Sequence, residues 1–286
     1  MAALNVKIEK AVITAAGRSQ HALPLQSLMD RDGLQKSALR IILEEASSSG
    51  VEDTCVVICP GDEKVYRAAA GDWGGRLHFV EQTEPLGYGH ALYCARDFVG
   101  REPFLHFVSD HLYLSREKRR CAEQLVAVAA AESCSVSAVQ ATRESVLPFY
   151  GAIGGKGVAN KPELYVVENV LEKPSPTEAE QQLIVPGLRA GHYLCFFGMH
   201  VLTPAVMEIL GAKLEHSDPA RPLPLSAALN ELARRERYLA FESRGRRYNI
   251  GIKFGLFYAQ LALALDGQDR EEVLAQFTEI LASRLG

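Results

Sequence analysis

The stretch Pro103-Phe-Leu-His-Phe-Val-Ser-Asp-His-Leu112 is an apolar, aromatic-rich run of strand length that turns polar at Ser109 and Asp110. In open α/β sheets, ligands bind outside the carboxyl ends of the strands. A carboxylate directly after a buried strand is therefore well placed to hold a divalent cation. A plainer interpretation is that Asp110 caps a turn, because Asp is a common turn residue. The rest of the chain decides between the two.

On the N-terminal side of this stretch, β-prone runs alternate with helical patterns. Strands are predicted within residues 10–17 and over 54–59 and 77–80, and helices over 37–49, 62–70 and about 91–98. Ser37 and Asp62 are the predicted N-caps of the first two helices. This alternation predicts an α/β fold with a doubly wound, mixed but mainly parallel sheet.

On the C-terminal side the pattern changes near residue 142. A helix over about 117–131 and a strand over about 135–141 come first. Strands over 149–153, 163–172 and 192–202 follow, separated by predicted turns at Gly154-Gly155, Lys161-Pro162 and Pro174-Ser-Pro176. We expect a first half, residues 1–142, and a second half, residues 143–286, that share one continuous sheet without a linker between them.

Helices dominate the end of the chain. Thr203 is the predicted N-cap of a helix with Pro204 at its first position. Helices are also predicted over 225–235 and 255–265, with a short strand at 238–242 between them. The last segment carries an apolar stripe of Val273, Leu274, Phe277, Ile280 and Leu281. The stripe predicts an amphipathic helix that packs on the domain or on a second subunit of a homo-oligomer.

The composition is that of a globular protein, since 48% of the 286 residues are hydrophobic and 23% are charged. The formal net charge is −4 and no basic block occurs, so we do not expect nucleic acid as a partner. No apolar run reaches a membrane-spanning length, so no membrane association is expected.

The six cysteines lie mostly in apolar runs, and the Cys55–Cys59 spacing fits neither a zinc pair nor a disulfide framework. This pattern predicts reduced thiols in a cytoplasmic protein.

Several well-known catalytic motifs are absent from the sequence. The turn after the first predicted strand is Ala15-Ala16-Gly17-Arg18, which is neither a G-x-G-x-x-G dinucleotide motif nor a phosphate-binding loop of the Walker type. H-E-x-x-H and G-x-S-x-G are also missing. Hydride transfer, Walker-type hydrolysis and nucleophile-elbow catalysis therefore lose their usual support.

Six short motifs stand instead at the predicted sheet ends: Ala15-Ala16-Gly17, Pro85-Leu-Gly-Tyr-Gly-His-Ala91, Phe107-Val-Ser-Asp110, Tyr150-Gly151, Glu172-Lys173-Pro174 and Gly251-Ile-Lys-Phe-Gly255. In order and spacing they resemble the sugar-1-phosphate nucleotidyltransferases, most of all the bacterial UTP:glucose-1-phosphate uridylyltransferases, from Lys10 to about Ala264. The resemblance implies a Rossmann-like nucleotide-diphospho-sugar transferase fold, with a nucleotide-binding first half and a sugar-phosphate-binding second half.

The resemblance also implies a reaction. An oxygen of a sugar 1-phosphate attacks the α-phosphorus of a nucleoside triphosphate, and pyrophosphate leaves, with Mg²⁺ as the cofactor. UTP and glucose 1-phosphate are the expected substrates and UDP-glucose is the expected product. Such a transfer needs positioning and cations rather than a covalent nucleophile.

Matching positions imply roles for the nucleotide side of the site. The backbone of Ala15, Ala16 and Gly17 approaches the nucleotide. Gln82 and Gly87 bind the base, because the side-chain amide of Gln82 both donates and accepts, as the edge of uracil does. A plainer interpretation of Gln82 is an exposed strand end.

The sugar side of the site is implied in the same way. Tyr150, Gly151 and Glu172 line the sugar pocket, where Glu172 accepts hydroxyl hydrogens. Lys173 meets the sugar phosphate as a point charge. A plainer interpretation is that Glu172 and Lys173 form an ordinary surface pair, and that Lys253 is an ordinary surface lysine.

The chain departs from the family pattern at two places. His21 stands where the family has a triphosphate-gripping arginine, and Asn249 stands where it has a second metal-binding aspartate. Arg18 or Arg31 is then the candidate for the missing positive charge. The expected catalytic residues are Asp110, Lys173 and Arg18, and the expected metal ligands are Asp110 and Asn249, of which the amide is the weaker ligand for a hard cation.

We consider two alternative functions, the first of which is suggested by these departures. The chain is alternatively a catalytically weakened homologue that binds a nucleotide sugar as a sensor or partner subunit. A glycosyltransferase on a similar sheet is the other alternative, and it would release a nucleoside diphosphate instead of pyrophosphate.

Overall fold

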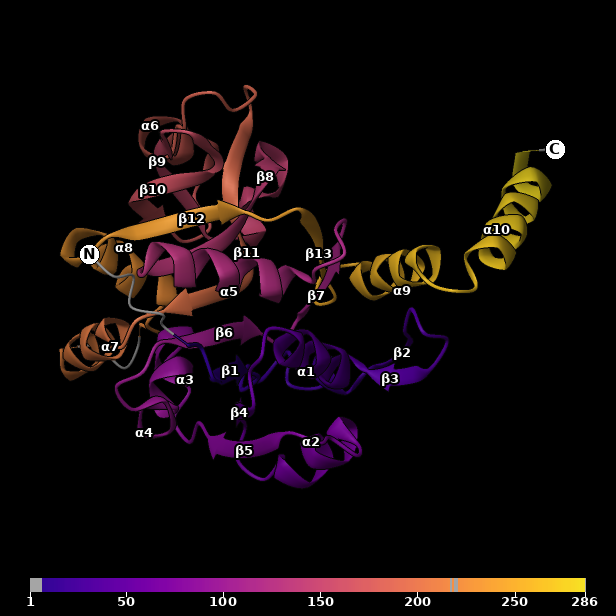
Figure 1. The fold of residues 1–286 in the computed structure, drawn as a ribbon, viewed down its shortest axis with the longest axis horizontal. Helices are drawn as coiled ribbons and strands as arrows, with labels where there is room; N and C mark the ends of the chain where they lie inside the picture. The colour runs from indigo at the N-terminus through magenta and orange to yellow at the C-terminus, as the bar shows by residue number, and fades with distance from the viewer. Residues whose placement is uncertain (1–6, 217, 219–220, 286) are drawn as a thin grey trace.

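The computed structural model describes residues 7–216, 218 and 221–285 and has a nine-stranded sheet at its centre (Figure 1). Four parallel strands form one side in the order β5 (Arg76–Glu81), β4 (Asp53–Ile58), β1 (Lys10–Thr14) and β6 (Phe104–Val108). The sheet continues through β11 (His192–Leu202), β8 (Ser135–Arg143), β12 (Tyr238–Glu242), β10 (Lys161–Leu171) and β9 (Ala152–Val158). β11 runs antiparallel to both β6 and β8, so the sheet is mixed. The predicted α/β fold is confirmed.

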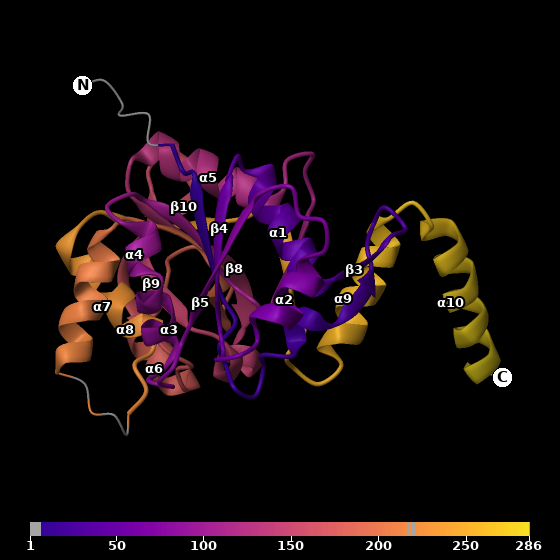
Figure 2. The same cartoon turned by 90° about the horizontal axis from the view of Figure 1, so that it is seen from below.

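Helices cover both faces of this sheet (Figures 1 and 2). One face carries α1 (Ala38–Ser48), α2 (Glu63–Ala70) and α5 (Cys121–Glu132), and the other carries α3 (Tyr88–Cys94), α4 (Arg96–Val99), α7 (Ala205–Glu215) and α8 (Leu225–Arg235). Neighbouring residues of β1 belong to the two different cores, since Ile13 packs with α1 and Val12 packs with α3. A strand buried on both faces is apolar throughout, which explains why this half shows continuous apolar runs.

The helix starts were predicted with mixed success. Ser37 caps α1, because its hydroxyl accepts a hydrogen bond from the backbone N–H of Arg40 (2.9 Å). Asp62 occupies the N-cap position of α2, but its side chain makes no capping bond. The prediction for α7 is wrong by one residue, since Pro204 is the N-cap and the hydroxyl of Thr203 donates to Glu236 (2.7 Å).

A small second sheet was not predicted. β7 (His111–Ser115) pairs antiparallel with β13 (Gly245–Asn249) directly beyond the end of β6. The helix predicted over about 117–131 therefore begins later, as α5 at Cys121. The expected polar loop after β1 also contains structure, a short 3-10 turn η1 (Leu23–Leu25) and a hairpin of β2 (Ser27–Met29) and β3 (Gln35–Ser37).

The predicted turns of the second half are partly wrong. Gly154 and Gly155 lie inside β9, and Lys161-Pro162 begins β10. The two glycines permit a close approach of backbone, because a Cβ at Gly155 would lie 1.9 Å from the carbonyl oxygen of Val166. Two short helical segments, η2 (Glu144–Phe149) and α6 (Pro176–Gln182), stand where a strand start and a turn were expected.

The C-terminal helices α9 (Gly255–Asp266) and α10 (Arg270–Leu285) extend away from the sheet (Figures 1 and 2). Three residues of the predicted apolar stripe on α10 are exposed, Leu274 at 41%, Ile280 at 57% and Leu281 at 50%, whereas Val273 and Phe277 are half-buried. α10 contacts α9, so the stripe packs on the domain only in part. Packing of α10 on a second subunit stays a prediction.

Candidate functional site

Several loops meet at one edge of the sheet because the strands before them are parallel. β1, β4, β5 and β6 point the same way. The residues that follow them are Ala15, Cys59, Gln82 and Ser109-Asp110. Backbone bonds fix the loop starts, since the N–H of Ala15 donates to Val57 (2.7 Å) and that of Gln82 donates to Ile58 (2.9 Å). The predicted nucleotide and metal residues of the first half therefore share one edge.

The small sheet brings Asn249 beside Asp110. Asn249 pairs with His111 in the β7–β13 ladder, and the backbone N–H of Ile250 donates to the carbonyl of Asp110 (2.8 Å). The side-chain oxygen of Asn249 accepts from the N–H of Gly251 (2.8 Å). Two segments more than a hundred residues apart thus place a carboxylate and an amide oxygen at adjacent backbone positions. Both are oxygen ligands of the kind that hard cations prefer.

Asp110 is held in its charged form by its neighbours. The ring N–H at Nδ1 of His111 donates to the Oδ1 of Asp110 (2.7 Å). Burial alone would raise the pKa of Asp110, but the charge and hydrogen bond of His111, with a smaller contribution from Lys173, hold that pKa below its ordinary value. Asp110 is therefore ionised at neutral pH, and Lys173 is close enough to act on it.

The predicted sugar-binding residues also lie together near Asp110. The ring of Tyr150 meets that of His111 edge-on (5.9 Å between centroids), and the guanidinium of Arg247 lies 3.9 Å from the Tyr150 ring centre. A Cβ at Gly151 would lie 3.3 Å from the Oε2 of Glu172. The loops at 150–151 and 172–173 therefore converge beside the β7–β13 sheet.

Lys173 has an unusual backbone. Its φ of 45° lies in the left-handed region, which residues with side chains rarely adopt. Strain of this kind concentrates at functional sites. Both Glu172 and Lys173 are exposed, so their charged groups are accessible to a ligand.

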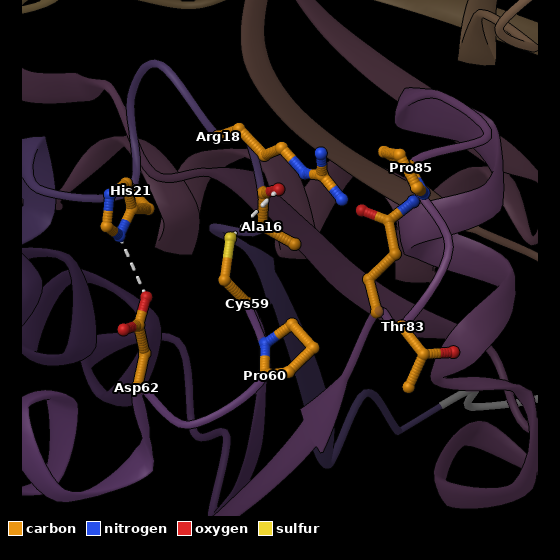
Figure 3. Close-up of a pocket in the computed structure, with 9 residues that line it drawn as sticks. Ala16, Arg18, His21, Cys59, Pro60, Asp62, Thr83 and Pro85 are labelled. Atoms are coloured by element: carbon orange, nitrogen blue, oxygen red, sulfur yellow. Dashed lines mark hydrogen bonds and ion pairs between the residues drawn. The ribbon is translucent and has the colours of Figure 1, made fainter.

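A pocket of about 320 Å³ opens beside β1 and β4 (Figure 3). Its lining residues are Ala16, Arg18, His21, Cys59, Pro60, Asp62, Gln82, Thr83 and Pro85. Ala16, Arg18 and Gln82 were predicted to contact the nucleotide, and the structure brings them together here. Ala15 is buried, at 2% exposure, whereas Gly17 is exposed. In Figure 3 the guanidinium of Arg18 reaches across the pocket, away from His21 and toward Pro85.

His21 does not present a free positive charge to this pocket. Its Nδ1–H donates to the Oδ2 of Asp62 (2.8 Å). The thiol of Cys59 lies beside this pair, and the pKa of Cys59 is raised by burial and further by Asp62, with Arg18 opposing. Arg31, the other candidate for the missing charge, is not among the residues that line this pocket, and its guanidinium lies 3.4 Å from the carboxylate of Asp266 at the end of α9. Arg18 is thus the arginine of the two that lines the pocket.

Gln82 and Gly87 belong to one closed loop. Gln82 is 8% exposed, so the interpretation as an exposed strand end is wrong. Its side-chain NH₂ donates to the carbonyl of Gly87 (3.0 Å), which holds the amide in place at the pocket. Gly87 has a φ of 106°, and a Cβ there would lie 2.6 Å from the backbone of Leu223. Gly87 is therefore required by backbone packing, whatever it contributes to a ligand.

Two neutral groups lie beneath the site. The pKa of Tyr88 is raised by burial and by the charges of Asp110 and Glu172, so its phenol stays protonated. The pKa of His106 is lowered by burial and by His200, so its ring is uncharged. The ring nitrogen Nε2 of His106 lies 3.3 Å from the hydroxyl of Thr14. This layer links the end of β1 to the Asp110 region without adding charge.

Three residues of this edge were not predicted from the sequence to be functional. His111 was not assigned a role, Cys59 was taken as a core thiol, and Asp62 was taken as a helix cap. The signals were present, since an Asp-His pair follows β6 and the tetrapeptide Cys59-Pro60-Gly61-Asp62 follows β4. Lys253 is exposed, in agreement with its plainer interpretation as a surface lysine.

Comparisons with known proteins identify the family of the chain. A sequence model of the nucleotidyl transferase family matches residues 10–258. The chain is 29% identical to the UTP–glucose-1-phosphate uridylyltransferase YngB of Bacillus subtilis, over 97% of each protein. It is also 29% identical to the UTP–glucose-1-phosphate uridylyltransferase of Streptococcus pneumoniae, over 92% of each.

Solved structures show the same fold. A UDP-glucose pyrophosphorylase complexed with UDP-glucose superimposes with a TM-score of 0.73 at 23% identity, covering 90% of this chain and 98% of that one. A UTP-bound UGPase from Acinetobacter baumannii superimposes with a TM-score of 0.72 at 20% identity, covering 95% of this chain and 99% of that one. Within the part of the chain that the structure describes, no helix combines the length and apolarity needed to cross a bilayer.

Proposed function

The chain belongs to the nucleotidyl transferase family, and from that membership we propose that it forms UDP-glucose and pyrophosphate from UTP and glucose 1-phosphate. The observation that carries this proposal is that the strand bearing Asn249 pairs beside Asp110 at the carboxyl edge of the parallel strands, and that the charge of Lys173 helps to lower the pKa of Asp110. The names of the two uridylyltransferases that it resembles over nearly their whole length support the choice of substrates.

The pocket beside β1 is the proposed nucleotide side of the reaction. Ala16 and Gln82 form its buried wall, so they bring backbone and amide groups close to a uracil nucleotide. Arg18 is the proposed contact of the triphosphate, and this role is supported by the position of Arg18 in the pocket lining and by the permanent charge of its guanidinium. His21 is tied to Asp62 and does not replace an arginine.

Asp110 and Asn249 are the proposed ligands of Mg²⁺. Their oxygen donors fit a hard cation, and the charge on Asp110 supplies the attraction. Such an ion, when bound, spreads the negative charge of the phosphates. A single carboxylate with an amide neutralises less of the ion's charge than two carboxylates would, so a raised magnesium requirement is expected.

The proposed reaction needs no nucleophile from the protein. A phosphate oxygen of glucose 1-phosphate forms a bond to the α-phosphorus of UTP, and the bond from that phosphorus to the pyrophosphate oxygen breaks. Lys173 holds the sugar phosphate as a point charge, and Glu172 accepts hydroxyl hydrogens of the sugar. Positioning and charge stabilisation supply the catalysis.

The chemistry of the cysteines supports a cytoplasmic location for this reaction. All six cysteines are free thiols in the structure. Unpaired thiols are typical of proteins in a reducing compartment.

A pyrophosphate-release assay tests the proposal. The purified protein is incubated with UTP, glucose 1-phosphate and Mg²⁺, and pyrophosphate is measured after hydrolysis by a pyrophosphatase. Turnover that requires all three components is the expected result. Absence of turnover with every common nucleoside triphosphate and sugar phosphate would reject the enzyme. Binding of UDP-glucose in calorimetry without any turnover would favour the sensor or partner subunit, and release of UDP would favour a glycosyltransferase.

A further inference from the structure

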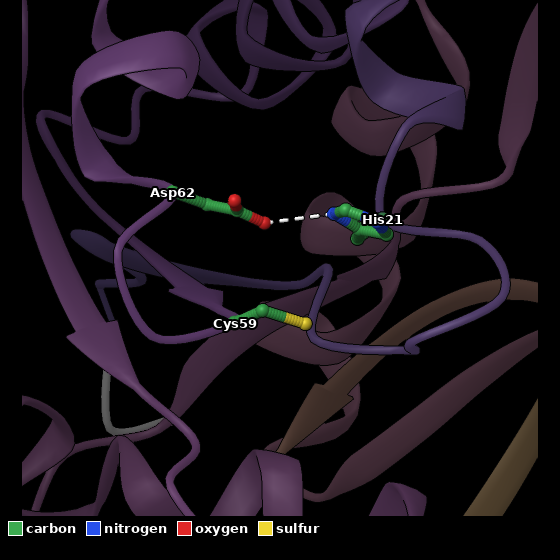
Figure 4. A group of neighbouring side chains, drawn as sticks. All are labelled: His21, Cys59 and Asp62. Carbon is green, nitrogen blue, oxygen red and sulfur yellow. Dashed lines mark hydrogen bonds and ion pairs between the residues drawn. The ribbon is translucent and has the colours of Figure 1, made fainter.

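Three side chains of different chemistry meet on one wall of the pocket (Figure 4). His21 lies in the loop after β1, Cys59 directly follows β4, and Asp62 precedes α2. One ligand atom of each, an imidazole nitrogen, the thiol sulfur and a carboxylate oxygen, lie within 4.8 Å of one another. Figure 4 shows the Asp62 carboxylate and the His21 ring pointing toward each other, with the Cys59 thiol beside them.

A tight turn positions two of the three side chains. In Cys59-Pro60-Gly61-Asp62 the backbone N–H of Asp62 donates to the carbonyl of Cys59 (3.2 Å). Pro at the second position and a Gly with a φ of 85° at the third position are typical of a type II turn. The N–H of Gly61 also donates to the Oε1 of Glu81 (2.8 Å). The turn therefore fixes the spacing of the thiol and the carboxylate.

The third side chain is fixed by a buried tyrosine of the neighbouring helix. The hydroxyl of Tyr66, which is fully buried in α2, donates to the carbonyl of His21 (2.6 Å). Tyr66 lies one helical turn after Asp62, so one short helix anchors both the His21 loop and the turn. The three ligand atoms are thus held close together by the backbone around them, and not by their mutual contact alone.

An ion pair explains only part of this arrangement. The His21–Asp62 contact is a partly exposed pair of an ordinary kind, with side chains 41% and 22% exposed. It does not account for a thiol at the third corner, whose Sγ–H now donates only to the carbonyl of Ala16 (3.3 Å). A thiol is a weak donor but, as a thiolate, a strong ligand of borderline cations.

We propose that His21, Cys59 and Asp62 form a binding site for a borderline divalent cation of the zinc class. Nitrogen, sulfur and oxygen ligands together suit Zn²⁺ or Co²⁺, whereas Mg²⁺ prefers oxygen ligands alone. In a tetrahedral zinc site with bonds of about 2.0 to 2.3 Å, neighbouring ligand atoms lie about 3.5 Å apart. Rotation of the side chains, which moves the ligand atoms by roughly 1 Å, therefore brings them to the distances that zinc requires. Binding converts the thiol to a thiolate and releases that one proton to solvent, while the neutral imidazole of His21 carries its own proton on the ring nitrogen that does not bind the cation. The cation offsets the two negative charges of Cys59 and Asp62.

Three protein ligands leave the fourth position of a tetrahedral cation open. This position faces the pocket, where Arg18 and Thr83 lie across from the three ligands (Figure 3). A water or an anionic group of a ligand completes the coordination there. The cation site depends on the three side chains only, so it stands or falls separately from the proposed transferase activity.

Cobalt titration tests the site directly. The full-length protein is stripped of metal with a chelator, desalted into buffer with a phosphine reductant, and titrated with CoCl₂. We expect one equivalent to give a thiolate-to-cobalt charge-transfer absorption and the strong visible bands of a tetrahedral ion, both removed by one equivalent of Zn²⁺. Release of one proton per cation is expected in weakly buffered solution. Absence of the charge-transfer band at several equivalents of Co²⁺ would overturn the proposal.

Variants assign the band to these residues. Cys59→Ser is expected to abolish the charge-transfer band. Loss of a residue that contacts only a metal ligand lowers metal affinity about 10- to 100-fold. Asp62→Asn and His21→Ala remove ligands themselves, so each is expected to lower cobalt affinity by more than that. Cys94→Ser is the matched control, because Cys94 is also a half-buried thiol and its sulfur lies 3.7 Å from the Nε2 of His90. A band that survives Cys59→Ser, or that disappears in Cys94→Ser, refutes the assignment. Circular dichroism of each variant identifies any that fails to fold, and the remaining two ligand variants then decide.

Discussion

The Asp110 region and the His21 pocket lie at the same edge of the sheet, yet they organise charge differently. Asp110 stands at the end of a central strand, where the β7–β13 ladder holds the segment that carries Asn249. His21 and Asp62 stand in loops, where they pair with each other. The first region keeps a carboxylate charged although it is largely buried, and the second pairs its own polar side chains by a hydrogen bond.

This difference indicates which region performs which task. A charged carboxylate with an adjacent amide oxygen attracts a hard cation and the phosphates that accompany it. A wall whose side chains pair with one another, opposite Arg18, offers a shaped pocket, which suits selection of a ligand more than stabilisation of a transition state. Substitutions in the Asp110 region are therefore expected to lower turnover, and those in the pocket to weaken nucleotide binding.

The largest expected effect is that of Asp110→Asn. The variant keeps the shape of the side chain but loses its charge, so kcat for pyrophosphate release is expected to fall about 10²- to 10³-fold, as when one group that stabilises the transition state is removed. Asp97→Asn is the matched control, since the Asp97 side chain is 89% exposed on α4. Full activity of Asp110→Asn, measured with saturating UTP and Mg²⁺, would remove the distinction between the two regions.

Gly87→Ala separates backbone packing from ligand contact in the loop beside the pocket. The new Cβ would lie 2.6 Å from the backbone of Leu223, and the φ of 106° disfavours any side chain. The free energy of unfolding in urea is expected to fall by more than about 2 kcal/mol. Gly74→Ala is the control, because a Cβ at Gly74 has no neighbour within 4 Å, and a change within about 0.5 kcal/mol is expected there. Equal stability of the two variants would contradict the packing role.

The Asp110 region was predictable from the sequence only in part. The apolar run of β6 and its abrupt end at Ser109-Asp110 were visible, because a strand buried on both faces leaves a continuous signal. β13 was invisible, since Gly245-Arg-Arg-Tyr-Asn249 has no apolar alternation. That strand forms because β7, from a distant part of the chain, offers it backbone partners. Local pattern contains no information on such pairing.

In the pocket, by contrast, the local features were recognisable in the sequence but their arrangement in space was not. Each local feature was recognisable, since Ser37 and Asp62 stand at helix starts and Cys59 follows a strand. What the sequence did not show is that the side chain of Asp62 turns to His21 rather than to its own helix. His21 and Asp62 lie in loops of two different βα units, and they become neighbours only when the fold brings these loops side by side. The partly exposed stripe of α10 is a related case, because amphipathic spacing predicts a buried face but not the surface that covers it.

Arg18→Ala tests whether the pocket contributes to UTP binding rather than to turnover. Loss of one charged contact to the triphosphate is expected to raise KM for UTP about tenfold, or roughly 1.4 kcal/mol, with a smaller change in kcat. Arg101→Ala is the control, because Arg101 is exposed and precedes β6 at the opposite edge of the sheet. A kcat loss comparable to that of Asp110→Asn, with KM unchanged, would assign Arg18 to the transition state instead.

The smallest expected effect is that of Tyr66→Phe, which tests whether the pocket wall is held by its backbone anchors. The hydroxyl of Tyr66 donates to the carbonyl of His21 (2.6 Å) and lies 3.3 Å from that of Ala15, and the substitution removes both contacts without changing the ring. The free energy of unfolding is expected to fall by about 1 kcal/mol, the net worth of a typical buried hydrogen bond. Tyr258→Phe is the control, because Tyr258 is 53% exposed on α9 and its hydroxyl can bind water. Little change in the free energy of unfolding is expected there.

The loop anchored by Tyr66 carries His21 and Arg18. In Tyr66→Phe, KM for UTP is therefore expected to rise, while kcat is expected to stay unchanged. If Tyr66→Phe lowers the stability but leaves KM unchanged, the loop keeps its position through its other contacts. The pocket would then need the Tyr66 hydrogen bonds less than the Asp110 region needs the pairing of β7 with β13.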